Sequence, residues 1–283
     1  LAQTRQMLDQ PAAALDAYDR CLALRPLHAA SWSQRGTALR DLGRGDDAAA
    51  SFESALALGD DDDGLTAYYL AAVRGGDAPA RAPEGYVKRL FDDYAADFDQ
   101  HLLDDLGYCA PEVLQRLVIG EGRGSFDSVL DLGCGTGLCG PLFRPLAGRL
   151  AGVDLSAAML AVARGRAVYD ELLQADIVDH LAGSTQQHDL VLAADVFIYL
   201  GDLAPVFAGV RRALRPGGLF AFSVEPAPAG LPFALQASLR YAHGDAALRD
   251  LAASTGLRLL QVQDGALRVD DVHDVQGRYY LLG

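Results

Sequence analysis

Glycines and carboxylates with the spacing of a ligand-binding loop lie between residues 128 and 154. Gly133, Gly135 and Gly137 alternate directly after a short apolar run, which predicts a buried strand that ends in a tight loop. Asp131 precedes this loop, and Asp154 ends the next apolar run, 23 residues after Asp131. Glycine lets the backbone approach a ligand closely, and an acid at the tip of a second parallel strand can accept hydrogen bonds from a ribose diol. The pattern therefore predicts a nucleoside-containing cofactor.

Two cofactors compete for this loop. Gly135, Gly137 and Gly140 also satisfy the G-x-G-x-x-G pattern of dinucleotide-binding dehydrogenases. Asp131, however, would repel a pyrophosphate, whereas it suits the cationic amino group of S-adenosylmethionine, which has no phosphate. The D-x-G-x-G-x-G form of residues 131–137, followed by Asp154, resembles motif I and the acidic loop of class I S-adenosylmethionine-dependent methyltransferases.

Three further segments follow in the order that this family requires. Residues 172–176 resemble its third strand, residues 188–195 its fourth strand, and residues 214–222 the turn and strand that form its fifth. The resemblance covers residues 86–283 and favours a methyltransferase over a dehydrogenase. It implies a doubly wound α/β fold with a seven-stranded sheet in the order 3-2-1-4-5-7-6. In this fold residues 258–269 and 277–282 would form the closing antiparallel hairpin, with residues 270–276 as its turn.

The resemblance also implies which residues contact S-adenosylmethionine and its product S-adenosylhomocysteine. The methionine end would be lined by Asp131, Gly133 and Gly135, and Gly137 belongs to the same loop. The ribose would be held by Asp154. The adenine would lie beside Leu155 and Met159, with its edge on Asp176 and Ile177. Each of these acids could instead cap a helix or end a strand in solvent. No metal site is expected.

An aromatic segment precedes the glycine loop. Phe91, Tyr94 and Phe98 stand three and four residues apart, which places them on one face of a helix. Such a stripe can be core, or it can belong to a lid over the cofactor. The segment resembles that of bacterial tetratricopeptide-linked and type 11/12 methyltransferases, which implies lid helices over residues 86–120. Tyr86, Phe91 and Tyr94 would then contact the cofactor.

The acceptor end of the site is expected in two segments. Asp195 and Tyr199 follow the fourth strand, where the chain has neither Asn-Pro-Pro-Tyr nor Asp-Pro-Pro-Tyr, so methylation of DNA adenine or of glutamine is disfavoured. Residues 225–244 are expected to form a substrate cap. There Arg240 could pair with a carboxylate and His243 could take a proton, unless this stretch is only the first turn of a helix. His243, Tyr241 and Asp195 are thus catalytic candidates, and Arg240, Tyr241 and Tyr199 are substrate-binding candidates.

The net charge, the apolar runs and the cysteines of the chain limit the kinds of partner and setting that are expected. The net charge of −14 argues against binding a nucleic-acid backbone, and no apolar run is long enough for a membrane span. The four cysteines show neither metal-ligand nor disulfide spacing, which favours a reducing, cytoplasmic setting.

Residues 1–76 differ from the rest and carry an internal repeat with a period of 34 residues. Ala14, Tyr18 and Cys21 recur as Ala48, Phe52 and Ala55. This period resembles tetratricopeptide repeats, in which a small residue such as Gly36 lets paired helices approach closely. Leu1–Leu24 would be a repeat with an incomplete first helix, and Leu65–Val73 the opening helix of a third. Residues 77–85 read as a linker to the methyltransferase domain of residues 86–283.

Three functions therefore stay open. The chain could methylate a small-molecule or peptide-like acceptor. Alternatively, the repeats could dock a protein substrate for methylation. The third possible function is that of a binding or scaffolding protein that has lost methyltransferase activity, although the intact glycine loop argues against this function.

Overall fold

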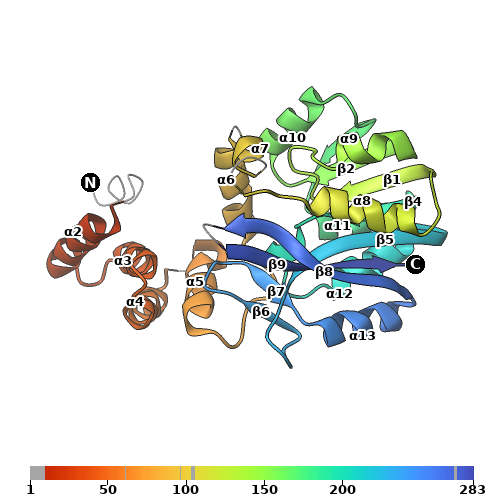
Figure 1. The fold of residues 1–283 in the computed structure, drawn as a ribbon. Coiled ribbons are helices and arrows are strands. Elements are labelled where there is room, and N and C mark those ends of the chain that lie inside the picture. The colour runs from red at the N-terminus through yellow and green to blue at the C-terminus, as the bar shows by residue number, and fades with distance from the viewer. Residues whose placement is uncertain (1–9, 61, 96, 103–105, 271–272) are drawn as a thin grey trace. The chain divides into compact units, whose positions relative to one another are not determined.

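The computed structural model describes residues 10–60, 62–95, 97–102, 106–270 and 273–283, which form two compact units (Figure 1). The first unit comprises Leu1–Tyr86 together with Ala234–Arg240, and the second comprises Val87–Phe233 and Tyr241–Gly283. The sequence placed residues 234–240 in a substrate cap of the methyltransferase domain, whereas their contacts group them with the helical unit. Among the described residues, no helix is long and apolar enough to cross a membrane.

The helical unit is built from α2 (Pro11–Leu24), α3 (Ala29–Asp41), α4 (Gly45–Ala57) and α5 (Leu65–Arg74), and each helix contacts the next. A Cβ at Gly36 would lie 2.5 Å from the Phe52 ring, so this glycine does allow the close approach of α3 and α4. The Tyr68 hydroxyl donates to the carbonyl of Leu239 (2.5 Å), which ties residues 234–240 to α5. Residues 1–9, which belong to the expected first repeat, lie outside the described residues.

The second unit contains the sheet. The strands of this unit are β1 (Phe126–Leu132), β2 (Ala147–Asp154), β3 (Glu171–Gln174), β4 (His188–Ala193), β5 (Leu214–Pro226), β7 (Tyr241–His243), β8 (Leu259–Asp270) and β9 (His273–Leu282). Strand β6 (Phe233–Leu235) begins at Phe233 of this unit, and its last two residues belong to the segment grouped with the helical unit. Strands β3-β2-β1-β4-β5 pair in that order, β5 pairs antiparallel with β9, and β9 pairs with β8. The expected order is therefore found, with β9 and β8 as its seventh and sixth strands.

The sheet differs from the expectation in its details. Beyond the seven strands in the expected order, β7 and β6 add to the end of β5, so that the sheet has nine strands. Tyr241–His243, for which the first turn of a helix was the alternative interpretation, form strand β7. The closing hairpin is also longer than expected: Gln276 pairs with Ala266 and His273 with Asp270, so most of the predicted turn is strand.

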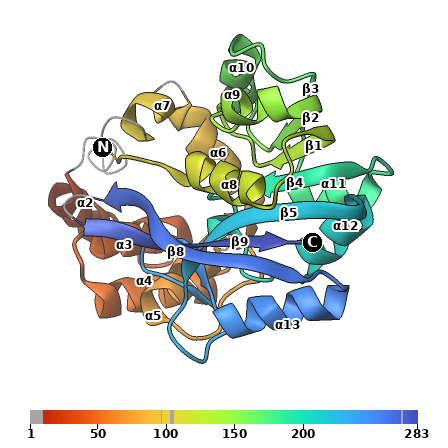
Figure 2. The same ribbon diagram turned by 45° about the vertical axis from the view of Figure 1, so that its right-hand side comes forward.

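Helices cover both faces of the sheet, because alternate strand residues point to opposite sides (Figures 1 and 2). Val129, Leu190 and Leu219 pack with α8 (Ala110–Gly120) and α9 (Gly140–Phe143). Their neighbours in sequence pack with α11 (Ile177–Gly183), α12 (Ala204–Ala213) and α13 (Asp245–Thr255) on the other face. Helix α8 is thus part of the layer on the sheet, whereas α6 (Glu84–Tyr94) and α7 (Phe98–Gln100) precede it in the segment for which the sequence predicts a lid.

Candidate active site

The glycine loop follows β1 and has the backbone that its sequence predicts. Gly133, Gly135 and Gly137 have φ values of +61°, +53° and +86°, in the left-handed region that favours glycine. A Cβ at Gly133 would lie 2.6 Å from a methyl group of Val196, so the segment after β4 packs directly on the loop. A Cβ at Gly135 would meet nothing within 4 Å, so the loop is open at that residue.

Asp131 lies on β1 beneath this loop and is only 1% exposed. The Tyr169 hydroxyl donates to its Oδ2 (2.6 Å). Burial raises the pKa of Asp131 to about 7; the Tyr169 hydrogen bond lowers it, and the nearby Asp154 raises it further. A buried carboxylate of this kind is stabilised by a cationic ligand.

Asp154 ends β2 and faces the same loop. Its Oδ2 accepts from the amide of Gly135 and its Oδ1 from the amide of Ser156, both at 2.8 Å. Burial raises the pKa of Asp154, although these amides oppose the shift. Ser156 in turn caps α10 (Ala157–Gly165) by accepting from the amide of Met159 (3.1 Å). The two amides fix the direction of the carboxylate at the strand tip.

The other residues expected at the adenine lie nearby in the fold but have structural roles as well. Asp176 caps α11 and accepts from the amides of Val178 (2.8 Å) and Asp179 (3.1 Å), as the alternative reading of this acid predicted. Met159 and Ile177 are buried, whereas Leu155 is half-buried.

Two carboxylates that the sequence analysis missed join α6 and α7 to the segment after β2 and to the glycine loop. Asp92 of α6 accepts from the hydroxyl of Ser156 (2.6 Å). Asp99 of α7 accepts from the hydroxyl of Thr136 in the glycine loop and forms an ion pair with Arg166. Both acids were visible in the sequence, but only the fold brings them onto these loops.

The aromatic residues of this segment separate into two groups. The Phe91 ring lies 5.4 Å from that of Tyr199 and 6.1 Å from that of Phe98, and Tyr94 lies 5.4 Å from Phe98. Tyr86 instead belongs to the helical unit, where its ring packs on those of Tyr68 and Tyr69. Phe91 and Tyr199, expected at the cofactor and at the acceptor respectively, are therefore in contact.

Asp195 directly follows β4 and forms part of a buried ion-pair cluster. It has a φ of +57°, which is strained for a residue with a side chain, and its amide donates to Ser223 Oγ (2.8 Å). Arg268, only 2% exposed, donates to Asp195 Oδ2 (2.7 Å) and to Glu225 Oε1 (2.6 Å). Asp195 Oδ1 is buried and has no hydrogen-bond partner among the described residues. A buried orphan acceptor on a strained backbone is typical of a functional site.

The structure does not bring the remaining candidates to this cluster. Tyr241 is fully buried against the ring of Phe233. His243 is 3% exposed, and its Nε2 donates to the carbonyl of Leu200 (2.8 Å). Burial lowers the pKa of His243 to about 4, so the ring is neutral near pH 7. Arg240 belongs to the helical unit. Catalytic roles for Tyr241 and His243 stay predictions that this packing disfavours, because a base must reach the acceptor.

The described residues fit S-adenosylmethionine better than a dinucleotide. The loop is open at Gly135, and two carboxylates at its base, the buried Asp131 and the half-buried Asp154, have raised pKa values. Such acids suit a ligand with cationic groups and a diol, and disfavour a pyrophosphate. Within the described part of the chain, no cluster of His, Cys, Asp or Glu could hold a metal ion.

Comparison with known proteins agrees with this fit. A family profile described as a methyltransferase domain matches residues 130–222. The malonyl-[acyl-carrier protein] O-methyltransferase of Salmonella typhimurium is 31% identical over 174 residues, which are 61% of this chain and 67% of that protein. The trans-aconitate 2-methyltransferase of Paracidovorax citrulli is 36% identical over 146 residues, 49% of this chain and 55% of that protein. Several other curated relatives are matched over less than half of their length.

Solved structures show the same fold. The magnesium protoporphyrin IX methyltransferase of Synechocystis PCC 6803 with bound S-adenosylhomocysteine has a TM-score of 0.54 and 17% identity, over 70% of this chain and 98% of that chain. The same enzyme with bound S-adenosylmethionine has a TM-score of 0.54 and 18% identity, over 70% of this chain and 95% of that one. The cofactor of the present protein is S-adenosylmethionine, and the chain belongs to the class I S-adenosylmethionine-dependent methyltransferases.

Proposed function

We propose that this enzyme methylates a nucleophile on a small-molecule or peptide-like acceptor. One observation carries the proposal: Asp195, on a strained backbone, offers a buried, unpartnered oxygen beside the segment that packs on the glycine loop. Its relatives, which include a malonyl-[acyl-carrier protein] O-methyltransferase and a ubiquinone biosynthesis O-methyltransferase, support an acceptor of this kind.

The cofactor-binding residues keep the roles that the sequence suggested. When bound, S-adenosylmethionine supplies an electrophilic methyl group on a sulfonium sulfur. Asp131 holds its amino group, Gly135 lets the backbone approach it, and Asp154 accepts hydrogen bonds from its ribose. Two amides already orient the Asp154 carboxylate, which reduces the entropy lost on binding. Leu155, Met159, Asp176 and Ile177 surround the adenine.

At the acceptor end, Asp195 Oδ1 accepts a hydrogen bond from the nucleophile, and Arg268 holds the carboxylate in place through Oδ2. Phe91 and Tyr199 form an aromatic wall that excludes water from the reacting groups. Alignment of nucleophile and methyl group in such a site can supply several kcal/mol of the rate enhancement, on the order of 7 kcal/mol in favourable cases.

A labelled-methyl assay tests this proposal. The full chain is incubated with S-adenosylmethionine carrying a labelled methyl group and with separate sets of carboxylates, phenols, amines and peptides. We expect label in one small-molecule or peptide set, and we expect Asp195→Asn to lower kcat by roughly tenfold to a hundredfold with the cofactor affinity unchanged. Label that enters only intact folded proteins would contradict the proposal.

A second candidate function keeps the same chemistry but uses the helical unit to dock a protein substrate. Leu24 and Leu27, at the end of α2 and in the turn after it, are 85% and 78% exposed. This candidate requires the two leucines to belong to one apolar patch, because it is contiguous apolar patches that mark interaction sites. If a protein is the acceptor, Leu24→Glu with Leu27→Glu should raise its KM without changing the affinity for S-adenosylmethionine. An unchanged KM would remove this candidate.

A further inference from the structure

Tyr169 is an aromatic residue that packs against the glycine loop, although it belongs to none of the sequence motifs. It lies between α10 and β3, next to the turn at Ala167, whose φ is +54°. Its hydroxyl donates to Oδ2 of Asp131 (2.6 Å). No hydrogen bond in the described part of the chain engages Oδ1, the other oxygen of this carboxylate.

Three glycines make room for the Tyr169 ring. A Cβ at Gly137 would lie 2.9 Å from the ring, one at Gly140 would lie 2.7 Å from it, and one at Gly152 would lie 3.1 Å from it. Gly137 belongs to the glycine loop, Gly140 begins α9, and Gly152 lies in β2. The ring therefore occupies a cradle that exists only because these positions lack side chains.

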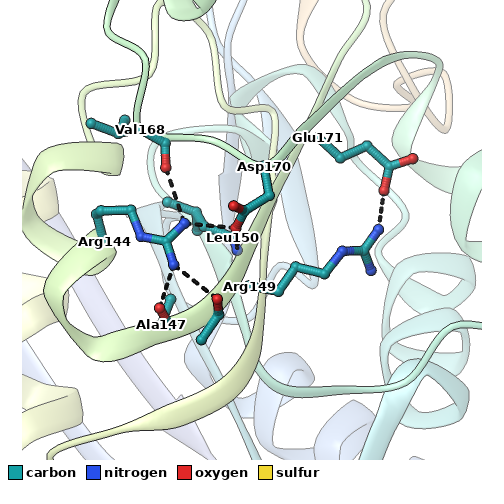
Figure 3. A network of polar contacts seen from close by, with 8 residues as sticks. Arg144, Ala147, Arg149, Leu150, Val168, Asp170 and Glu171 are labelled. Atoms are coloured by element: carbon teal, nitrogen blue, oxygen red, sulfur yellow. Dashed lines mark hydrogen bonds and ion pairs between the residues drawn. The ribbon is translucent and has the colours of Figure 1, made fainter.

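The backbone on either side of Tyr169 is held as well, as Figure 3 shows. Arg144 donates through Nη1 to the carbonyl of Val168 (3.4 Å) and to Oδ2 of Asp170 (2.6 Å). The same Oδ2 accepts from the amide of Leu150 (2.7 Å), and the amide of Asp170 donates to the carbonyl of Leu150 (2.8 Å). The residue before Tyr169 and the residue after it are thus both held by Arg144, and Asp170 is also bonded to Leu150 of β2.

We infer that Tyr169 is a positioning residue for the cofactor. By holding Oδ2 of Asp131, its hydroxyl directs Oδ1 towards the ammonium group of S-adenosylmethionine. The inference rests on the proposed role of Asp131 in binding that group. It adds a function for a residue outside the motifs and a reason why Gly140 and Gly152 are glycine.

The pH dependence of cofactor binding can report on the hydrogen bond between Tyr169 and Asp131, because it follows the charge of Asp131. The ionisable groups that face it are Tyr108 before α8, Cys134 and Cys139 in and after the glycine loop, Asp154 on β2, and Tyr169. Burial raises the pKa of both thiols and both phenols, so these groups stay neutral between pH 5.5 and 7.5. The α-amino group of the ligand stays protonated over most of this range, because its usual pKa is about 7.7–8.0. The affinity for the cofactor should therefore rise with pH as Asp131 loses its proton.

Calorimetric titration of the full chain with S-adenosylmethionine from pH 5.5 to 7.5 tests the inference. Tyr169→Phe keeps the ring and removes one hydroxyl, so we expect roughly tenfold weaker binding at pH 6.5. The pH at which affinity levels off should move upwards, since the lost hydrogen bond favoured the charged carboxylate. Site-specific 3-fluorotyrosine at position 169, a stronger donor, should move it downwards.

Tyr280→Phe is the matched control, because its hydroxyl also donates to a carboxylate, Asp245 Oδ1 (2.8 Å), outside the cofactor site. It should bind as the unmodified chain does. The inference is overturned if neither change at position 169 moves the pH profile while Asp131→Asn weakens binding. If Asp131→Asn also binds unchanged, the proposed role of Asp131 fails instead. Should Tyr169→Phe not fold, the 3-fluorotyrosine protein decides alone.

Discussion

At the scale of single residues, His188 links the stability of the fold to pH. It is 1% exposed at the start of β4, and its Nδ1 lies 2.9 Å from the hydroxyl of Ser128. Burial, followed by the charges of Arg149, His180 and Arg215, lowers its pKa to about 4. The ring is thus neutral in the folded state at pH values well above 4.

This shift predicts the pH dependence of unfolding. The unfolded chain binds a proton at His188 near pH 6.5, whereas the folded chain does so only near pH 4, so stability falls as pH falls through this window. We expect His188→Gln to reduce the loss between pH 6.5 and 4.5 by roughly 1–3 kcal/mol. Urea unfolding at a series of pH values measures it.

Comparison with the variant is needed because other groups titrate in the same range. Protonation of His243 changes the free energy of unfolding in the same direction as protonation of His188. The pKa of Asp131 is instead raised to about 7, so the stability that this group contributes is lost as pH rises. These contributions are shared by both proteins and cancel in the difference. Parallel curves for the unmodified chain and His188→Gln would show that His188 is not responsible.

At the scale of elements, the β8–β9 hairpin positions Arg268 through a break in its register. Pairing shifts between Ala266 and Arg268, and Leu267 and Arg268 are both buried although neighbours on a regular strand face opposite ways. A bulge that turns a side chain in this manner is common beside active sites. Opposite the bulge, a Cβ on Gly277 would overlap the side chain of Leu267.

The hairpin offers a paired test of this arrangement. Gly277→Ala should destabilise the chain by about 1–3 kcal/mol, because Leu267 must move. Gly265→Ala is its control: Gly265 pairs directly with Gly277, but its Cβ would meet only Tyr279, at an ordinary 3.5 Å. Thermal unfolding compares the two, and equal melting temperatures would contradict the packing described for Leu267.

The ion-pair cluster gives a second prediction at this scale. Arg268→Met removes the buried cation that pairs with the carboxylates of Asp195 and Glu225, so we expect a loss of about 3–5 kcal/mol in the free energy of unfolding. Arg249→Met breaks an exposed pair with Asp245 and should cost at most about 1 kcal/mol. Chemical denaturation measures both. Similar losses in the two variants would mean that the cluster is not a tightly coupled unit.

At the scale of the whole molecule, the sequence predicted the parts that are local and failed where distant segments meet. The glycine loop, the acid at the tip of β2 and the strand order could be predicted, because each depends on a short pattern or on the resemblance it carries. Tyr169 and Arg268 could not, because a left-handed turn at Ala167 and a bulge before Arg268 set their directions. Neither feature has a sequence signature of its own.

The same limit explains why the packing disfavours the catalytic candidates at the acceptor end. His243 and Tyr241 have residue types suited to acid–base chemistry, but residue type does not reveal burial. Both lie on a strand that adds to β5, where their side chains pack into the interior. Residues 234–240 join the helical unit through contacts as distant as Tyr68 to Leu239, which no local pattern predicts.

The central claim is that S-adenosylmethionine binds at the glycine loop with its ribose on Asp154. Calorimetric titration of the full chain with this cofactor tests it most directly, with Asp154→Asn as the variant and the exposed Asp264→Asn as its control. We predict one cofactor per chain, binding weakened at least about tenfold by Asp154→Asn, and no change with Asp264→Asn. No binding to the unmodified chain, or equal affinity in all three proteins, would contradict the claim.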